Sequence, residues 1–500
     1  MMVSRRLNFA LVLALLHVCA AQLGAQHRGD NLAFQGLSHL SVGGAKAYAM
    51  GGAFTSISGD LNGVFWNPAG LAAVEGFQLA VSARSLSGLW RENQIYRPNR
   101  LFVTLPFYLE GFYTPDPANN GRLDHELAQD TNYVVEHPEL GLEPFSEAAA
   151  DWQKEIDDFG ISSMTAVVPL KFFGSPMVMA LSYHKQSGLL DYDRNDTYLN
   201  PHLGSLEYEV LPRIDGNDTV AVDWYRFSRQ RSGDIQTIRG ALAIGLSDRV
   251  EVGMRLGLLS GRTDDMQALN QVGYFNLYEE NEFSFSYDTL DTEVSGTSTF
   301  SAIELSAGAI IRLTNFNLGF RFTLPQILSR DWDYETVISD PDQTNTTTGS
   351  GADKLKLPAA YSLGLSFVPA EAFTIAIDFE KLPYSQAIFE LANEDTTHKP
   401  WVDSSVLRFG VEFKAAAFLS LLGGYQYRTQ EFVPDGAAFK AQGPAASRYT
   451  MGASIRLGRL GRIDVAYDLQ QLKYYDSYYS NTNYALELRN RLTVEYVIGF

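Results

Sequence analysis

The residues that could carry chemistry in this chain are few and widely spaced. A lipase serine needs a Gly-x-Ser-x-Gly elbow, and the sequence contains none. His184 and His202 are isolated histidines, which are usually solvated side chains. The single cysteine, Cys19, lies within the first 25 residues, which have the pattern of a cleaved export signal. We therefore expect no thiol catalysis, disulfide or thiolate metal site in the mature chain. The sequence therefore predicts a protein that is not an enzyme and has no cofactor.

One acidic stretch has the opening spacing of a calcium loop. Asp191, Asp193 and Asn195 alternate as the first ligands of an EF-hand do. Asp196 stands where that loop requires glycine, and His202 stands where it requires glutamate. We therefore predict no metal site, and a loose calcium site in a loop is the alternative.

The first 25 residues have the pattern of an export signal. Two arginines within the first six residues precede a mostly apolar run, and small-residue cleavage sites follow. We predict that residues 1–25 are a signal peptide. A lipoprotein cleaved before Cys19 is the alternative, which His17 and Val18 disfavour because they suit the positions before a lipidated cysteine poorly.

The composition narrows the class of protein. A net charge of −19 argues against nucleic-acid binding. The sequence has no apolar run of the roughly 18 residues that a membrane helix needs. Its 30 phenylalanines and 26 tyrosines are instead typical of a β-barrel with aromatic girdles at two membrane interfaces.

The apolar residues of the C-terminal two thirds alternate with polar ones, as in strands that have one apolar face. The polar face mixes Gly, Ser and Ala with single charged residues, which fits a crowded barrel lumen better than bulk water. The clearest alternating segments are 250–258, 318–324, 361–367, 373–379, 407–413 and 463–469.

Short turns alternate with long connections, as in outer-membrane barrels with long extracellular loops. The long connections are 187–234, 260–298, 325–356, 381–404 and 428–447. Thirteen strands follow residue 161, and 77–84 is the fourteenth. We therefore predict an all-β fold, a transmembrane antiparallel barrel of about 14 strands over residues 77–500.

Two segments before residue 161 are expected to lie outside the barrel wall. Residues 100–109 are strand-like, but Pro106 is awkward in a central strand, so we expect them in the first extracellular excursion. Residues 146–158 are expected to form a short surface helix in the same excursion.

The last strand alternates and ends on Phe500. A terminal aromatic residue resembles the sequence by which the outer-membrane assembly machinery recognises its substrates. We therefore expect a monomer in the outer membrane of a Gram-negative-type bacterium, with membrane lipid around it.

A glycine-rich stretch, residues 43–76, precedes the first strand. Proline fixes its own φ and excludes Asn67 from the helical region, so Asn67-Pro68-Ala69-Gly70 is predicted to be a rigid turn. Two bulky aromatics come directly before it. The motif comprises Gly51, Gly52, Asp60, Phe65, Trp66, Asn67, Pro68, Ala69 and Gly70.

This motif, followed directly by a strand, resembles the outer-membrane hydrophobic-compound transporters of the FadL/TodX type. The resemblance implies that residues 26–76 form a hatch that plugs the barrel. It also implies passive uptake of long-chain fatty acids or hydrocarbons, with lateral release at an inward kink in the third strand. Gly188 is the candidate kink, and the alternative is a glycine that only begins a loop.

Related PorV-like barrels have the same N-terminal pattern and serve as shuttles in protein secretion. A shuttle or partner-binding barrel is therefore the alternative function. A nonspecific porin is disfavoured because a hatch would block its lumen.

Candidate ligand contacts come from two groups of residues. The apolar residues Leu189, Leu190, Phe275 and Leu277 are candidates for a capture groove, or they only pack loops together. The lumenal arginines Arg255, Arg312 and Arg321 are candidates for contact with a head group. Pairing of these arginines with lumenal carboxylates is the favoured alternative, because a lumenal charge needs a partner.

Overall fold

The computed structural model describes residues 32–37, 43–94, 142–172, 175–201, 220–277, 283–392, 401–434, 442–477 and 482–499. The predicted signal peptide (1–25), the segment 100–109, His202 and Phe500 lie outside these ranges. Within them, no helix is both long and apolar enough to cross a membrane.

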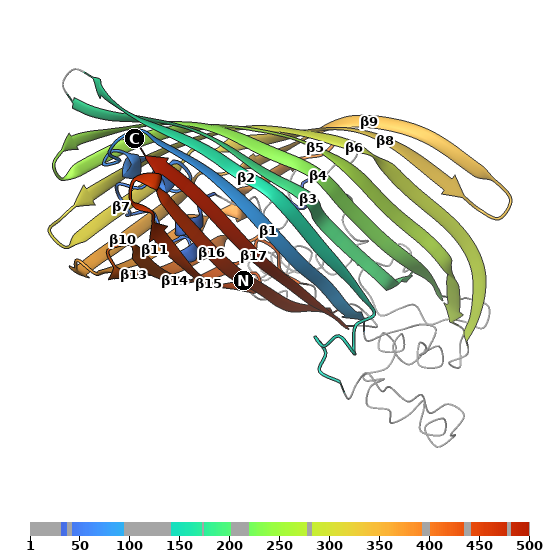
Figure 1. The fold of residues 1–500 in the computed structure, drawn as a ribbon. Coiled ribbons are helices and arrows are strands. Elements are labelled where there is room, and N and C mark those ends of the chain that lie inside the picture. Colours follow the sequence, from blue (N-terminus) through green and yellow to red (C-terminus); the bar gives the residue numbers. More distant parts are fainter. Residues whose placement is uncertain are drawn as a thin grey trace, which may run out of the picture.

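The described chain is almost entirely antiparallel strand (Figure 1). The strands are β1 (Gln78–Gln94), β2 (Trp152–Phe172), β3 (Ser175–Pro201), β4 (Val220–Ser247), β5 (Val250–Leu277), β6 (Phe283–Arg312), β7 (Phe316–Thr323), β8 (Gln326–Ser339), β9 (Thr344–Leu357), β10 (Ala360–Ala370), β11 (Phe373–Leu382), β12 (Ile388–Glu390), β13 (Ser404–Ala416), β14 (Leu419–Thr429), β15 (Ala445–Arg456), β16 (Arg462–Ser477) and β17 (Thr482–Gly499). The short helices are α2 (Ala45–Ala49), η1 (Leu61–Val64), η2 (Pro68–Leu71), η9 (Tyr384–Gln386) and η10 (Gly458–Leu460).

The sheet closes on itself because β1 pairs with both β2 and β17. Gln78 lies opposite Gly499 on one side and opposite Val167 on the other. β8, β9 and β12 continue the lines of β7, β10 and β11, so the barrel wall has fourteen strands. The prediction of a closed antiparallel barrel of about 14 strands is confirmed.

Two prolines explain why single wall strands are divided. Pro325 separates β7 from β8, and Pro358 separates β9 from β10. β7 and β8 nevertheless pair with the same neighbour, β6. Because proline has no N–H to donate, it interrupts the ladder without changing the order of the strands.

Four neighbouring strands are far longer than a membrane requires. β3, β4, β5 and β6 have 27, 28, 28 and 30 residues, whereas β7 has 8. At about 3.3 Å per residue, 28 residues span about 90 Å, several times the roughly 25 Å apolar band of a transmembrane barrel. We call the part beyond the band the wing; it consists of residues 187–201, 220–236, 260–277, 283–302, 326–339 and 344–357 (Figure 1).

The observed strand pairing overturns two sequence-based expectations. Most of the predicted long loops 187–234, 260–298 and 325–356 are paired strand, because neighbouring strands satisfy their backbone groups even where both faces are polar. The predicted helix 146–158 is also wrong. β2 begins at Trp152, opposite Glu92 of β1, and this long-range pairing outweighs a locally helical spacing.

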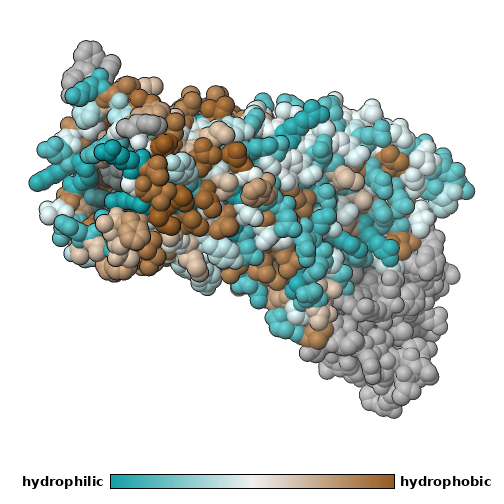
Figure 2. Space-filling model, in the orientation of Figure 1, coloured by the Kyte–Doolittle hydropathy of each residue, from teal (hydrophilic) through white to brown (hydrophobic). Residues whose placement is uncertain are grey.

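An apolar band surrounds the barrel. Met254, Leu256 and Leu258 of β5 are 56%, 44% and 49% exposed and point outward. Equivalent residues on the other wall strands are exposed as well. Figure 2 shows that hydrophobic residues gather over one end of the molecule, whereas hydrophilic residues predominate over the wing. This is the outer surface of a barrel that spans a bilayer.

Candidate functional site

Residues 43–76, the N-terminal segment, lie inside the banded end of the barrel (Figure 1). Its helix α2 packs against β14–β17, and η2 packs against β3–β6. Met50, Phe54 and Phe65 are completely buried between the segment and the wall. The segment therefore contacts most of the inner circumference.

Glycines of the wall make room for the N-terminal segment. A Cβ atom on Gly308 would overlap the side-chain oxygen of Asn67, and one on Gly319 would overlap the carbonyl oxygen of Thr55. Seven wall strands contribute such a glycine: Gly253, Gly308, Gly319, Gly364, Gly410, Gly424 and Gly452. The small residues on the polar face of the strands thus line the surface against which the segment packs.

Asn67 and Asp60 of the predicted motif organise the N-terminal segment. Asn67 Oδ1 accepts from the backbone N–H of Ala69 at 3.1 Å, and Asp60 Oδ1 accepts from that of Asn62 at 3.0 Å, so each residue caps a short helix. Asn67 Nδ2 donates to the carbonyl oxygen of Thr55 at 2.6 Å. These motif residues fix the conformation of the segment and its seat on the wall.

Two of the three predicted head-group arginines hold this segment. Arg255 donates to the carbonyl oxygens of Val64 and Phe65 and pairs with Glu304. Arg321 donates to the carbonyl oxygen of Trp66 at 3.1 Å and pairs with Glu380. Both arginines therefore have protein partners on two sides.

The third arginine, Arg312, lies elsewhere. It pairs with Glu251 at 3.1 Å at the end of β6, and its side chain is 39% exposed. All three arginines thus have carboxylate partners, as the pairing alternative expected.

A buried apolar cluster lies at the base of the wing. It joins the outer strip, Leu32–Leu37, to side chains from several wing strands and from β12. Its largest members are Phe34, Leu37, Leu190, Ile235, Phe300, Leu328, Leu355 and Phe389. Phe34 lies edge-on to Phe300 and to Phe389 at centroid distances of 6.5 and 6.3 Å.

The structure places the predicted groove residues in different environments. Leu190 is 2% exposed and belongs to this apolar cluster, whereas its neighbour Leu189 is half-buried outside it. The side chains of Phe275 and Leu277 lie outside the described part of the molecule.

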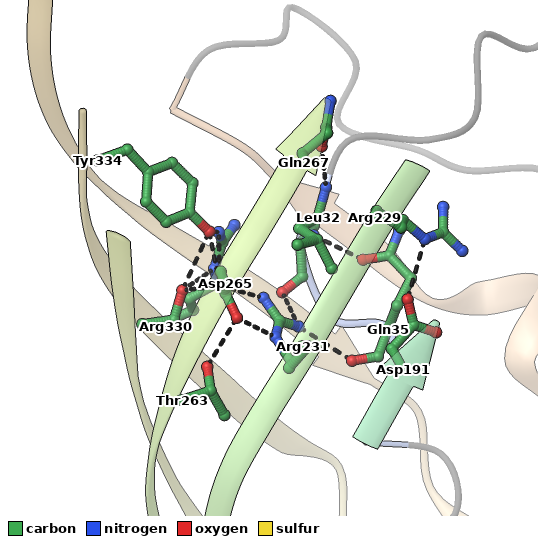
Figure 3. Close-up of polar contacts among 12 residues, drawn as sticks. Leu32, Gln35, Asp191, Arg229, Arg231, Thr263, Asp265, Gln267, Arg330 and Tyr334 are labelled. Carbon is green, nitrogen blue, oxygen red and sulfur yellow. Dashed lines mark hydrogen bonds and ion pairs between the residues drawn. The ribbon is translucent and has the colours of Figure 1, made fainter. Parts of the chain in front are cut away.

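A buried charge network borders the apolar cluster (Figure 3). Arg231 donates to both carboxylate oxygens of Asp265, at 2.8 and 2.7 Å. Its Nη1 also donates to the carbonyl oxygens of Ala33 and Gln35, at 3.0 and 2.9 Å. One wing arginine therefore attaches the outer strip to the wall.

Asp265 is the centre of this network. It also accepts hydrogen bonds from Thr263, Ser298 and Tyr334. Burial alone would raise the pKa of Asp265, but its hydrogen bonds and the charge of Arg231 outweigh burial and lower the pKa to about 2. Asp265 is therefore a fixed anion at neutral pH.

The backbone pairing between β2 and β3 ends inside the wall. The last paired residues are Ser163 and His184, although β2 continues to Trp152 and β3 to Pro201. We call this unpaired stretch, residues 153–162 and 185–194, the seam. It is bridged at its far end, where the indole N–H of Trp152 donates to the carbonyl oxygen of Arg194 at 2.9 Å.

Gly188 lies in the middle of the seam, within a continuous strand. Its φ of 96° is unusual for any residue but glycine, and the β3–β4 register shifts between Leu189 and Asp191. A Cβ on Gly188 would lie 3.5 Å from that of Asp158. Gly188 therefore lies within β3, beside a register shift, and does not begin a loop.

Comparison with solved structures identifies the architecture. No protein-family model matches the sequence, and comparison with curated proteins gives no match. The toluene transporter TodX of Pseudomonas putida matches with a TM-score of 0.58 and 13% identity over 92% of this chain and 99% of that one. A FadL homologue of Pseudomonas aeruginosa matches with a TM-score of 0.56 and 13% identity over 91% and 98%. The fold is that of the FadL/TodX barrels.

A further match is CymD, a monoaromatic hydrocarbon channel, with a TM-score of 0.50 and 13% identity over 92% of this chain and 98% of that one.

In this FadL/TodX-type barrel, sequence reasoning missed Arg231, Asp265 and Phe34. The first two were assigned to loops, although each alternates with outward residues on a long strand. Phe34 lies in a short segment whose neighbours on both sides are not described.

Proposed function

We propose that this chain is an outer-membrane transport protein that takes up hydrophobic compounds by passive diffusion. The observation that supports the proposal is a buried apolar cluster inside the wing of a membrane-spanning barrel, next to a segment that packs against most of the inner wall. A polar solute has nothing to gain from such a cluster, whereas an apolar one is stabilised by leaving water.

The N-terminal segment would stay in place during transport. It is held by Arg255, Arg321 and Asp378, and it packs against glycines on seven strands. A ligand that entered from the wing would therefore have to leave the lumen beside the segment. The contacts are too many for the segment to be released by one small molecule.

The seam is the exit that we propose for such a ligand. Its outer edge carries Phe159 and Ile161, which are 81% and 53% exposed and would face lipid. Its strands share no backbone ladder above Ser163 and His184, so opening it breaks few hydrogen bonds. The proteins of similar fold include a toluene transporter and a hydrocarbon channel, which agrees with an apolar cargo.

Uptake by liposomes tests this function. Purified protein reconstituted into liposomes should accelerate entry of a labelled long-chain fatty acid or of labelled toluene relative to protein-free liposomes. A labelled sugar of similar size is the control and should not enter faster. Uptake of both apolar probes at the protein-free rate would contradict the proposal.

The wing favours a second candidate, a barrel that binds a partner protein at the cell surface or in secretion. Strands that extend far beyond the apolar band are longer than uptake alone requires. Mass spectrometry of the protein purified from its native membrane separates the candidates. Copurifying lipids or hydrocarbons agree with transport, and a stoichiometric secreted protein without them agrees with a shuttle.

A further inference from the structure

The β8–β9 hairpin at the margin of the wing ends in an open strand edge (Figure 1). β9 pairs with β8 along its whole length, from Thr344 to Leu357. On its other side, within the part of the chain that the structure describes, β9 pairs only with β12, at residues 354–356. Residues 344–350 of β9 therefore have one strand neighbour among the described residues, and we call them the free edge.

The free edge has none of the features that usually protect an open strand. Natural edges carry charged residues, proline or a bulge, which prevent another strand from pairing. Residues 344–350 are threonine, asparagine, glycine and serine, all of them exposed, and they pair with β8 without a register shift. In an antiparallel pair every second residue directs its N–H and C=O away from the existing neighbour. The free edge therefore offers backbone donors and acceptors to an added strand.

A row of carboxylates runs beside the free edge on the outer face of the wing. Asp331, Asp333 and Glu335 of β8 are exposed and lie two residues apart, and we call them the acidic row. Their opposite residues on β6 are uncharged threonines and a serine. The nearest cation on β9, Lys354, lies opposite Ser329 at the base of the hairpin. Within the described ranges, no ion pair neutralises the acidic row.

Only small side chains separate the acidic row from the free edge. Thr348 lies opposite Glu335, and Ser350 lies opposite Asp333. A strand added to β9 would lie about 10 Å from β8, two strand spacings away. A lysine or arginine on that strand has a long stem that can extend past a threonine or serine toward the carboxylates. Because side chains on one face of a strand recur at every second residue, the matching strand has basic residues at alternate positions.

We infer that the free edge binds an extended segment of a partner protein, which adds a strand to β9 and places alternating lysines or arginines over the acidic row. A second copy of this chain fits less well, because its own free edge would bring a second acidic row and no cation for either. The inference rests on the partner-binding candidate and adds to it a surface and a chemical class of partner. It is independent of what the lumen carries.

Three labelled peptides test the pairing, each as long as the free edge and added to the full-length protein in neutral detergent. The first alternates lysine with threonine, the second has glutamate in place of each lysine, and the third is the first with methylated backbone nitrogens. We expect the first to bind and the second not to bind. The third should bind at least about tenfold more weakly than the first, because it has lost the N–H groups that donate to β9. Fluorescence anisotropy measures all three affinities.

A pair of substitutions tests the acidic row. Asp333→Asn with Glu335→Gln should weaken binding of the lysine peptide about threefold to tenfold, as loss of two exposed ion pairs predicts. The matched control is Asp291→Asn with Glu293→Gln, which removes the same charge from exposed positions on β6, one strand farther from the free edge. At physiological ionic strength, which screens charges beyond about 8 Å, this control should bind the peptide like wild type. Heat-dependent mobility in gels checks that each variant folds, and the peptide comparison needs no variant.

Three results would overturn the inference. If the methylated peptide binds as tightly as the unmodified one, no strand is added to β9. If the β8 variant binds the lysine peptide like wild type, or if the glutamate peptide binds equally well, the acidic row does not select the partner. If no peptide binds, the free edge does not take a partner segment, and a dimer in light scattering would then identify a second copy as its occupant.

Failure of the inference is distinguishable from failure of the proposed function. Uptake by liposomes does not depend on the free edge, so none of these results changes the transport proposal. A secreted protein that copurifies although no peptide binds would place the partner elsewhere on the barrel and would reject the free edge alone.

Discussion

Arg231 donates to the carbonyl oxygen of Ala33 at 3.0 Å while both oxygens of Asp265 accept from its guanidinium. Through this one side chain, the position of the outer strip depends on an ion pair of the wing. Arg231 is completely buried, so the strip cannot leave without exposing it or leaving its donors unpaired.

Removing this arginine should release the outer strip. In Arg231→Met, Asp265 becomes a buried charge without its main partner, which typically costs about 3–5 kcal/mol. Proteolysis within residues 32–37 should then become faster, while the N-terminal segment stays protected. Limited proteolysis with mass spectrometry measures both.

The matched control for that variant also removes the negative charge of Asp265. Arg231→Met with Asp265→Asn should regain part of the lost stability in denaturant titrations, because no unpaired anion remains. The outer strip should still be released, since its carbonyl oxygens have lost their donor. Equal stability of the single and double variants would show that the ion pair is not the stabilising element.

The pKa of Asp265 predicts how stability depends on pH. Its carboxyl has a pKa of about 2 in the folded protein, below the usual value, because of Arg231 and its hydroxyl donors. The stabilisation of about 2 kcal/mol is therefore present above pH 4 and is lost as the pH falls toward 2. Asp265→Asn should thus be less stable than wild type at pH 7 and similar to it near pH 2. An unchanged difference in unfolding free energy at both pH values would contradict this assignment.

Adding one methyl group to the wall should loosen the N-terminal segment. In Gly308→Ala the new Cβ overlaps the side chain of Asn67, so the segment has to move. We expect larger or more frequent openings in single-channel recordings on planar bilayers. Gly240→Ala is the control, because a Cβ there meets nothing within 4 Å, so this variant should conduct like wild type. Identical recordings from both variants would mean that the segment does not close the lumen.

A disulfide across the seam should stop lateral release. Cysteines at Asp158 and Gly188 would have Cβ atoms 3.5 Å apart, within the range of a disulfide. The oxidised double variant should lose most uptake in liposomes, and reduction should restore it. Each single cysteine variant controls for loss of the Arg84–Asp158 pair and for strain at Gly188.

A second disulfide serves as a matched control for the seam. Val168 and Met179 lie opposite each other on β2 and β3 where the two strands are already paired, and both point outward. Oxidation of cysteines at these positions should leave uptake unchanged. If uptake survives oxidation at 158 and 188 as well, the ligand leaves by another path.

The barrel could be predicted from sequence because its alternation has a direct physical cause. Leu256 faces lipid and Arg255 faces the lumen, and each pair of this kind marks one rung of a strand. Strand number and closure follow from repeating that pattern. The wing was missed because both of its faces are polar over long stretches, so no change of side-chain type marks where the strands end.

The inner sites depend on relationships that one sequence does not display. Arg231 and Ala33 are far apart in the chain, and nothing near either residue indicates the other. Arg255 and Arg239 look equivalent as lumenal arginines, yet Arg255 donates to two carbonyl oxygens of the N-terminal segment, whereas Arg239 only lies over the ring of Phe65. Only the packing of the N-terminal segment against the wall separates them.

The glycines that line the lumen also have a consequence for how the protein is made. They come from strands between β5 and β15, and each lies against backbone or side-chain atoms of the N-terminal segment. Without the segment, these strands would surround a void lined by bare backbone. Closure of the barrel and docking of the N-terminal segment should therefore be a single cooperative step. The other strands would have to surround residues 43–76 before β17 pairs with β1.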